Sequence, residues 1–187
     1  MKIFISGIAG FLGSHLAEIC VKKKYKVVGC DTLIGGTLEN LNDLDVEFHK
    51  VDCSDLDKMT EIMRGVDVLC HAAAFAHEGL SNVSPKLVSE NNVVGSVSTF
   101  TAAIKNKVKR IVFCSSMARY GNAPTPYVED TNPMPMDPYG ISKVAVEASS
   151  MGNAAKSRDT MDKIRFKEVK RESAQTDEAV NRMINMD

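Results

Sequence analysis

The sequence IFISGIAGFLG, which spans residues 3–13, places a short apolar run directly before three glycines and the start of a helix-period segment. The glycines are Gly7, Gly10 and Gly13. Glycine permits a positive φ, lets the backbone approach a pyrophosphate, and allows a helix to pack tightly against a strand. The helix N-terminus that follows offers unpaired N–H groups and partial positive charge to a diphosphate. Three glycines also occur in ordinary tight turns, so the interpretation depends on the rest of the sequence.

Beyond this stretch, short apolar runs alternate with segments of helical periodicity. We expect strands at 3–5, 27–30, 46–51, 66–70 and 110–114, and helices at 12–22, 56–63, 86–105 and 138–149. The runs are continuously apolar, which favours a parallel sheet covered by helices on both faces. Right-handed crossovers then predict an α/β, Rossmann-type doubly wound sheet with strand order 3-2-1-4-5 and a ligand crevice at the carboxyl ends of the strands.

An aspartate, Asp31, ends the second predicted strand, eighteen residues after Gly13. A carboxylate at this place can accept hydrogen bonds from both hydroxyls of an adenosine ribose and repels a 2′-phosphate. The position therefore favours NAD over NADP as the cofactor. The alternative is a carboxylate that only fixes a loop or caps a helix.

The bulk composition excludes several classes of partner. The formal charge of the 187 residues is −1, which gives no general attraction to nucleic acid or to anionic membranes. No apolar stretch approaches the ~20 residues that span a bilayer, and no signal peptide is evident. The five cysteines lack CxxC spacing and are expected to be core residues in a reducing compartment, not metal ligands. A cytoplasmic location without a metal site is the expectation.

A tyrosine and a lysine are predicted to lie together on the last helix. Asp137 and Pro138 have the residue types of an N-cap and a first helical residue, so Tyr139 and Lys143 fall one turn apart on one face. A phenol, with a pKa of about 10, is mostly protonated at neutral pH and is therefore a poor base. A lysine ammonium within several ångströms favours the phenolate, which could then take a hydroxyl proton. Alone, Tyr-x-x-x-Lys is also common on helix surfaces.

Several motifs in order along residues 1–148 resemble the extended short-chain dehydrogenase/reductase family, in particular its NAD-dependent epimerase/dehydratase members of the UDP-glucose 4-epimerase-like kind. The matching motifs are the glycine turn, Asp31, Val51-Asp52-Cys53, His71-Ala72-Ala73-Ala74, Asn91-Asn92-Val93-Val94-Gly95, Cys114-Ser115-Ser116 and Tyr139-Gly140-Ile141-Ser142-Lys143. The resemblance implies a catalytic group of Ser116, Tyr139 and Lys143. It implies NAD contacts at Gly7, Gly10, Phe11, Leu12, Gly13, Asp31, Asp52, Cys53, Ala72, Ala73, Ala74, Asn92, Tyr139 and Lys143.

The resemblance also assigns roles within these motifs. Asp52 and the backbone of Cys53 would hold the adenine, the alanines 72–74 would let the cofactor pass, and Asn92 would steady the central helix. The alternatives are a helix cap for Asp52, strand packing for the alanines and a satisfied helix-interior amide for Asn92. His71 is interpreted as structural.

The residues after the serine motif point to one reaction within the family. Family dehydratases usually carry acidic residues where this chain has Met117 and Ala118, so an epimerase-like cycle on a nucleotide sugar, most simply a UDP-sugar, is the better analogy. Tyr139 would remove the proton of the 4-hydroxyl. Substrate contacts are expected in the segment after the fourth strand, at His77, Glu78 and Ser81, although a solvated loop is an equal alternative. Tyr120 is either a packing aromatic or a pocket wall.

The chain departs from this family after the Tyr139 helix. Residues 1–150 form the predicted NAD-binding domain, and residues 151–187 form a charged tail, helical or disordered, without a further strand. The usual later strands and the substrate region are missing, which leaves the edge of the fifth strand exposed. Two functions stay open: a UDP-sugar epimerase, and a non-catalytic NAD-binding remnant or interaction module. The sequence leaves the oligomeric state open, and the resemblance implies that a homodimer would form through the helices at 86–105 and 138–149.

Overall fold

The computed structural model describes residues 1–128, 130–156 and 165–168, with the backbone alone described for 151–156 and 165–168. The elements follow a β-α-β order along the chain. They are β1 Lys2–Ser6, α1 Phe11–Lys22, β2 Lys26–Cys30, η1 Leu38–Leu41, β3 Val46–His49, α2 Leu56–Ile62, β4 Val68–His71, α3 Glu78–Val83, α4 Pro85–Val88, η2 Ser89–Val94, α5 Gly95–Lys105, β5 Arg110–Phe113, η3 Met117–Arg119, α6 Pro138–Lys156 and β6 Arg165–Glu168.

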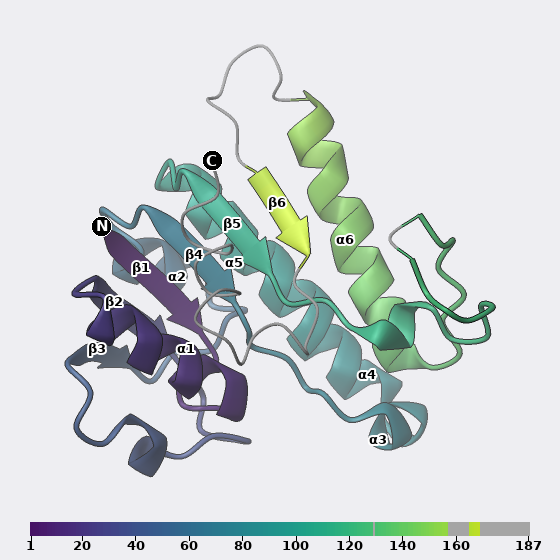
Figure 1. Ribbon diagram of the computed structural model, residues 1–187, viewed down its shortest axis with the longest axis horizontal. Coiled ribbons are helices and arrows are strands. Elements are labelled where there is room, and N and C mark those ends of the chain that lie inside the picture. Colours follow the sequence, from purple (N-terminus) through teal and green to yellow (C-terminus); the bar gives the residue numbers. More distant parts are fainter. Residues whose placement is uncertain (129, 157–164, 169–187) are drawn as a thin grey trace.

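A parallel sheet with the order β3-β2-β1-β4-β5-β6 forms the centre of the molecule (Figure 1). β1 pairs in parallel with β2 on one side and β4 on the other, so that Ile5 lies between Gly29 and Cys70. The predicted order 3-2-1-4-5 is confirmed. Because the strands are parallel, their carboxyl ends meet at one edge, and the functional motifs follow those ends.

A sixth strand corrects the expectation that the tail carries none. β6 pairs in parallel with β5, with Arg110 opposite Arg165 and Phe113 opposite Glu168. The segment RFKE contains a single apolar residue and therefore lacks the apolar pattern of a buried strand. A strand at a sheet edge is held by backbone hydrogen bonds and is compatible with charged residue types. The edge of β5 is therefore covered; the tail residues 157–164 and 169–187 lie outside the described part.

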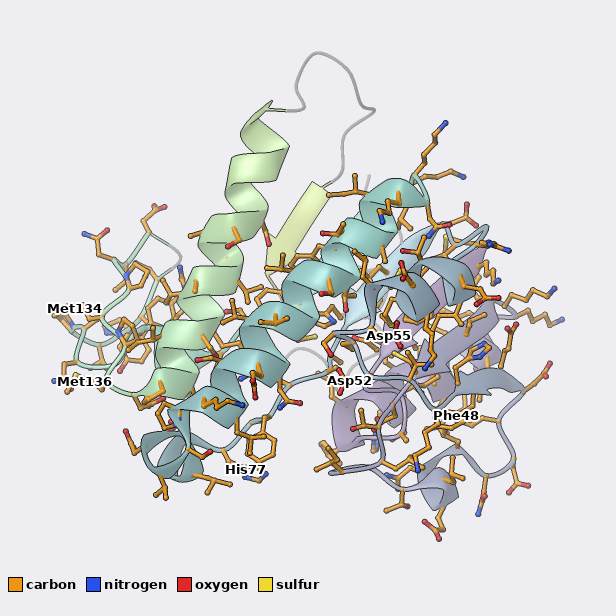
Figure 2. The ribbon with its side chains drawn as sticks, turned by 180° about the vertical axis from the view of Figure 1, so that it is seen from behind. Phe48, Asp52, Asp55, His77, Met134 and Met136 are labelled. Carbon is orange, nitrogen blue, oxygen red and sulfur yellow. The ribbon has the colours of Figure 1, made fainter. Side chains whose placement is uncertain are left out.

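Helices cover both faces of the sheet, as the continuous apolar strands predicted. On β1, Ile3 and Ile5 pack with Leu16 and Ala17 of α1, whereas Phe4 packs with the cluster formed by α2, α5 and α6 on the opposite face. Figure 2 shows the second face, with α5 and α6 lying side by side in front of the strands. This alternation along one strand buries apolar side chains on both sides of the sheet.

The helix predicted over 86–105 is interrupted. It consists of the short helix α4, the π-helical turn η2 and the helix α5. The Asn92 side chain lies in the π-helical turn, accepts a hydrogen bond from the Phe75 N–H at 2.7 Å and donates to the Ser142 hydroxyl at 3.1 Å. Single-turn π-helical segments are frequent at functional sites.

Candidate active site

The glycine turn between β1 and α1 is shaped by close backbone packing. Gly7 has φ +71°, and a Cβ there would lie 2.8 Å from the Cα of Ala73. A Cβ on Gly13 would lie 2.0 Å from the Gly7 carbonyl oxygen, whereas one on Gly10 would meet only that oxygen, at 3.3 Å. Gly7 and Gly13 therefore let the turn close against β4 and α1. A side chain on Gly10 would press on the Gly7 carbonyl oxygen, so this position too favours glycine.

The first turn of α1, which begins with Phe11 and Leu12, is suited to an anion. In the described structure no side chain caps this helix, and its first turn holds no acidic residue. Its N-terminal N–H groups and its partial positive charge therefore face the open side of the turn. This end of α1 therefore suits the diphosphate of a dinucleotide.

Asp31 lies beside the glycine turn, as predicted. Its carboxylate accepts hydrogen bonds from the Ala9 N–H at 3.1 Å and the Leu33 N–H at 2.8 Å. The carboxylate thus lies just after the carboxyl end of β2 and fixes the loop that follows. The Thr37 N–H and the Asn40 side chain both donate to the Ala9 carbonyl, which ties the following loop to the same turn.

Asp52 does not cap the helix after β3, so that alternative is wrong. Its carboxylate instead accepts hydrogen bonds from the N–H and the hydroxyl of Ser54, and Asp55 supplies the N-cap of α2. Cys53 is half-buried against the start of α5. A Cβ added to Gly95 there would lie 3.4 Å from the Cβ of Cys53. The adenine contacts expected of Asp52 and Cys53 stay a prediction.

The alanines after β4 run close to the glycine turn. The Ala72 N–H donates to the Ser6 carbonyl at 3.2 Å, and Ala73 is the residue that a side chain on Gly7 would strike. Ala74 is exposed. Small side chains at these positions leave room at the carboxyl ends of β1 and β4, which agrees with the expected path of the cofactor.

His71 is a structural residue. It is 1% exposed, and its ring nitrogens bond the Ser6 hydroxyl at 2.6 Å and the Ser96 hydroxyl at 2.8 Å. Burial, with a smaller contribution from the Lys143 charge, lowers the pKa of His71 to about 3. A neutral imidazole with both nitrogens bonded joins β4 to β1 and α5.

Acidification is therefore expected to destabilise the fold through His71. In the unfolded chain the imidazole protonates near its ordinary pKa of 6.5, while in the folded chain it stays neutral down to about 3. Between these values the free energy of unfolding falls by about 1.4 kcal/mol per pH unit. Urea unfolding from pH 7 to pH 4 should show that the native chain is more stable than His71→Gln at pH 7 and that this difference in free energy of unfolding shrinks as the pH falls. A stability difference between the native chain and His71→Gln that stays constant with pH would contradict this. An equal pH-dependent change for the exposed His15→Gln would contradict it as well.

Tyr139 and Lys143 lie together at the start of α6. The Asp137 side chain accepts a hydrogen bond from the Gly140 N–H at 2.8 Å, as expected of an N-cap. The Lys143 ammonium donates to the Cys114 carbonyl at 2.9 Å and lies 5.7 Å from the centre of the Tyr139 ring. Both side chains are buried. The one-turn spacing read from the sequence thus brings an ammonium close to the phenol.

Burial dominates the charge state of Lys143. It lowers the pKa of Lys143 to about 8, while the neighbouring Cys114 and Glu147 act in the opposite direction. The side chain consequently keeps its proton at neutral pH. A positive charge that is protected from water favours the ionised form of a nearby phenol more strongly than an exposed one.

Ser116 reaches the same place from β5. Its hydroxyl accepts a hydrogen bond from the Ala118 N–H at 3.2 Å and so caps η3. Gly140 permits this turn to approach α6, because a Cβ there would lie 2.7 Å from the Ala118 carbonyl oxygen. The structure therefore gathers the three expected catalytic residues where β5 ends and α6 begins. The requirement for glycine at 140 was not predicted.

A buried ion pair beside this group was missed by the sequence reasoning. Glu147, one turn beyond Lys143 on α6, pairs with Arg119 at the end of η3 at 2.9 Å. The Ser115 hydroxyl donates to the same carboxylate. The signal available in the sequence was the four-residue spacing from Lys143 to Glu147, which places both on one helix face.

The segment after β4 gives mixed results for substrate contact. His77, labelled in Figure 2, and Glu78 are exposed, whereas Ser81 is buried and donates to the Glu78 carbonyl. Ser81 therefore supports α3 instead of facing a ligand. Tyr120 is buried and stacks on Tyr127 with ring centres 4.7 Å apart, which favours a packing role.

Within the described residues, no helix is long and apolar enough to cross a membrane. Over the same part of the chain, no group of three or more histidine, cysteine or acidic side chains could hold a metal ion.

Comparison with known proteins supports the resemblance. The model of the NAD dependent epimerase/dehydratase family matches residues 3–159. The UDP-glucose 4-epimerase of Streptomyces lividans is 35% identical over 158 residues, which cover 82% of this chain and 48% of that protein. The enzyme of the same name from Lactobacillus helveticus is 34% identical over 150 residues, with 79% and 45% covered.

Solved structures agree. The UDP-glucose 4-epimerase of Thermotoga maritima with UDP-glucose superposes with a TM-score of 0.83 at 29% identity, covering 90% of this chain and 54% of that one. The enzyme of Thermus thermophilus in complex with NAD gives a TM-score of 0.81 at 29% identity, with the same coverage. The chain thus spans about half the length of the relatives it matches.

Proposed function

The chain belongs to the NAD-dependent epimerase/dehydratase family, and from this premise we propose that it supplies the NAD-binding and proton-transfer part of a UDP-sugar 4-epimerase. The observation that carries the proposal is the buried pairing of Lys143 with Tyr139 beside Ser116, at the same edge of the sheet as the glycine turn.

The residues present fit NAD. The positive φ of Gly7, the close backbone packing at Gly13 and the N-terminus of α1 suit a diphosphate, and the Asp31 carboxylate lies where the adenosine ribose would follow. We infer that Asp52 and Cys53 border the adenine and that the alanines 72–74 line the path. Asp31 would exclude the additional phosphate of NADP. Bound NAD would take up a hydride from the sugar and return it to the opposite face.

Proton transfer falls to the side chains of this chain. The Tyr139 phenolate would accept the proton of the sugar 4-hydroxyl and later give it back. Lys143 would favour the phenolate, and the Ser116 hydroxyl would bond the same sugar oxygen. The positions that would need an acid for water elimination are Met117, which is exposed, and Ala118. Epimerisation is therefore favoured over dehydration.

A titration with NAD followed by nucleotide sugars tests the proposal. Calorimetry of the purified chain should show NAD binding at least about tenfold more tightly than NADP, a difference of about 1.4 kcal/mol. Incubation with NAD and UDP-galactose should then give UDP-glucose, measured by NMR, and Tyr139→Phe should not. NAD binding without epimer formation would reduce the protein to a cofactor-binding module. No NAD binding would overturn the proposal entirely.

We also infer a homodimer through α5 and α6. Val94 in η2, Val97 on α5 and Ile141 on α6 are exposed, and the two long helices lie side by side on one face (Figure 2). Burying such apolar side chains against a second copy would remove them from water. Light scattering should give twice the chain mass of 20.4 kDa. The mass of a single chain at working concentration would contradict the dimer.

A cytoplasmic location is inferred as well. All five cysteines are free, three of them fully buried, which suits a reducing compartment.

A further inference from the structure

The buried carboxylate of Glu147 holds together three parts of the site. Its Oε2 accepts a hydrogen bond from the Arg119 Nε at 3.0 Å and lies 2.9 Å from Nη2, and its Oε1 accepts the Ser115 hydroxyl. Both charged side chains are less than one tenth exposed. The carboxylate therefore accepts hydrogen bonds on both of its oxygens and forms a buried ion pair with the guanidinium, and such charge-assisted hydrogen bonds are stronger than neutral ones.

Packing alone does not account for a pair of this kind. Removing an arginine and a glutamate from water costs several kcal/mol per ion, and apolar residues of similar volume often stabilise a fold equally well. Where such pairs have a role, it is commonly to impose one arrangement on the parts they join. Glu147 and Arg119 join α6 to the turn that follows β5.

Three interactions hold that turn against α6. Lys143 donates to the Cys114 carbonyl, Glu147 accepts the Ser115 hydroxyl, and Glu147 pairs with Arg119. Ser116 lies between the residues that are held. Its own hydroxyl accepts a hydrogen bond from the Ala118 N–H at 3.2 Å. The turn that carries Ser116 is consequently held by Glu147 on one side and by Lys143 on the other.

We propose that Glu147 is a positioning residue: through Ser115 and Arg119 it holds the turn that carries Ser116 against α6, which carries Tyr139 and Lys143. This inference rests on the proposed function and adds to it a residue that touches neither cofactor nor substrate. It acts through the residues that do.

The charges around Lys143 give the sign of the electrostatic effect. The titratable groups near the ammonium are the Cys114 thiol just after β5, His71 from β4, and Tyr139 and Glu147 from α6, with Arg119 of η3 paired to Glu147. Glu147 raises the pKa of Lys143 against the larger effect of burial. Replacing Glu147 by glutamine removes that support and leaves the Arg119 charge unbalanced. Both changes lower the pKa of Lys143 further.

The test uses the full chain and the variant Glu147→Gln. We expect kcat for epimerisation to fall about tenfold or more while KM changes little, because substrate contacts are retained and the reacting groups are displaced. The alkaline limb of the kcat profile should move to lower pH, and the pH at which NAD affinity declines should move with it. The matched control is Glu18→Gln, which removes an exposed carboxylate of α1 paired with Lys22.

A second variant covers the case in which Glu147→Gln does not fold. Ser115→Ala deletes only the hydroxyl that donates to Glu147, and should lower kcat about threefold to tenfold with an unchanged alkaline limb. Where both variants fold, the double variant should be non-additive, because the two residues act through one contact.

The outcomes separate this inference from the proposed function. Absence of NAD binding by the native chain overturns the proposed function and this inference with it. If the native chain binds NAD without epimerising, only the epimerase proposal fails, and the pH dependence of NAD affinity still decides the role of Glu147. Identical pH midpoints for the native and Glu147→Gln chains would overturn the inference alone. A loss of kcat without a shift of the pH profile would do the same if Glu18→Gln lost as much activity.

Discussion

Tyr139→Phe is expected to remove epimerisation and to leave NAD binding almost unchanged. The phenol is the group that exchanges a proton with the sugar in the proposed cycle, and a positioned acid–base group contributes about 10²–10⁴-fold to the rate. The ring itself is buried beneath the Lys143 ammonium, and phenylalanine keeps that ring. The loss should therefore appear in kcat, with a folded protein and an intact cofactor site.

The measurement is epimer formation by NMR together with calorimetric NAD binding and thermal unfolding. Tyr25→Phe is the matched control, since Tyr25 packs against the α1 side of the sheet, away from α6. Activity in Tyr139→Phe within a factor of about three of the native rate would show that another group moves the proton. A parallel loss of NAD affinity would instead show that the hydroxyl serves cofactor binding.

The parts of the fold that were predictable are those in which local pattern and tertiary structure agree. Apolar runs such as 3–5 and 27–30 become central strands because both of their faces are buried. The π-helical turn could not be predicted, because Asn92 bonds Phe75 and Ser142, which are distant in sequence. β6 was missed for the same kind of reason: its pairing with β5 depends on backbone groups and not on an apolar pattern.

The candidate site shows the same division. The glycine turn and the Tyr139–Lys143 spacing are local motifs, and the structure places them as expected. The sequence offers Asp52 as a possible cap of the helix after β3, but Asp55 caps α2. Which aspartate caps the helix depends on where the helix begins, and helix ends predicted from sequence are uncertain by a few residues. The pairing of Arg119 with Glu147 joins residues 28 apart, and composition does not reveal it.

Gly13→Ala should cost both stability and NAD affinity. The added Cβ would lie 2.0 Å from the Gly7 carbonyl oxygen and 2.8 Å from the Cα of Ile8, and both of these are backbone atoms that cannot rotate away. Either α1 moves outward or the turn opens. Overpacking of this kind costs about 1–3 kcal/mol, occasionally more. Because the N-terminus of α1 is the proposed diphosphate site, NAD affinity should fall more than about tenfold.

The control is Gly35→Ala in the neighbouring loop, where an added Cβ would meet nothing within 4 Å. Alanine there should leave NAD affinity unchanged and raise the free energy of unfolding slightly, because it restricts the unfolded chain by about 0.4–1 kcal/mol. Urea unfolding and calorimetry on both variants separate the two effects. Native NAD affinity and stability in Gly13→Ala would show that the close contact between α1 and the turn does not shape the cofactor site. The assignment of the diphosphate to this helix end would then have to be abandoned.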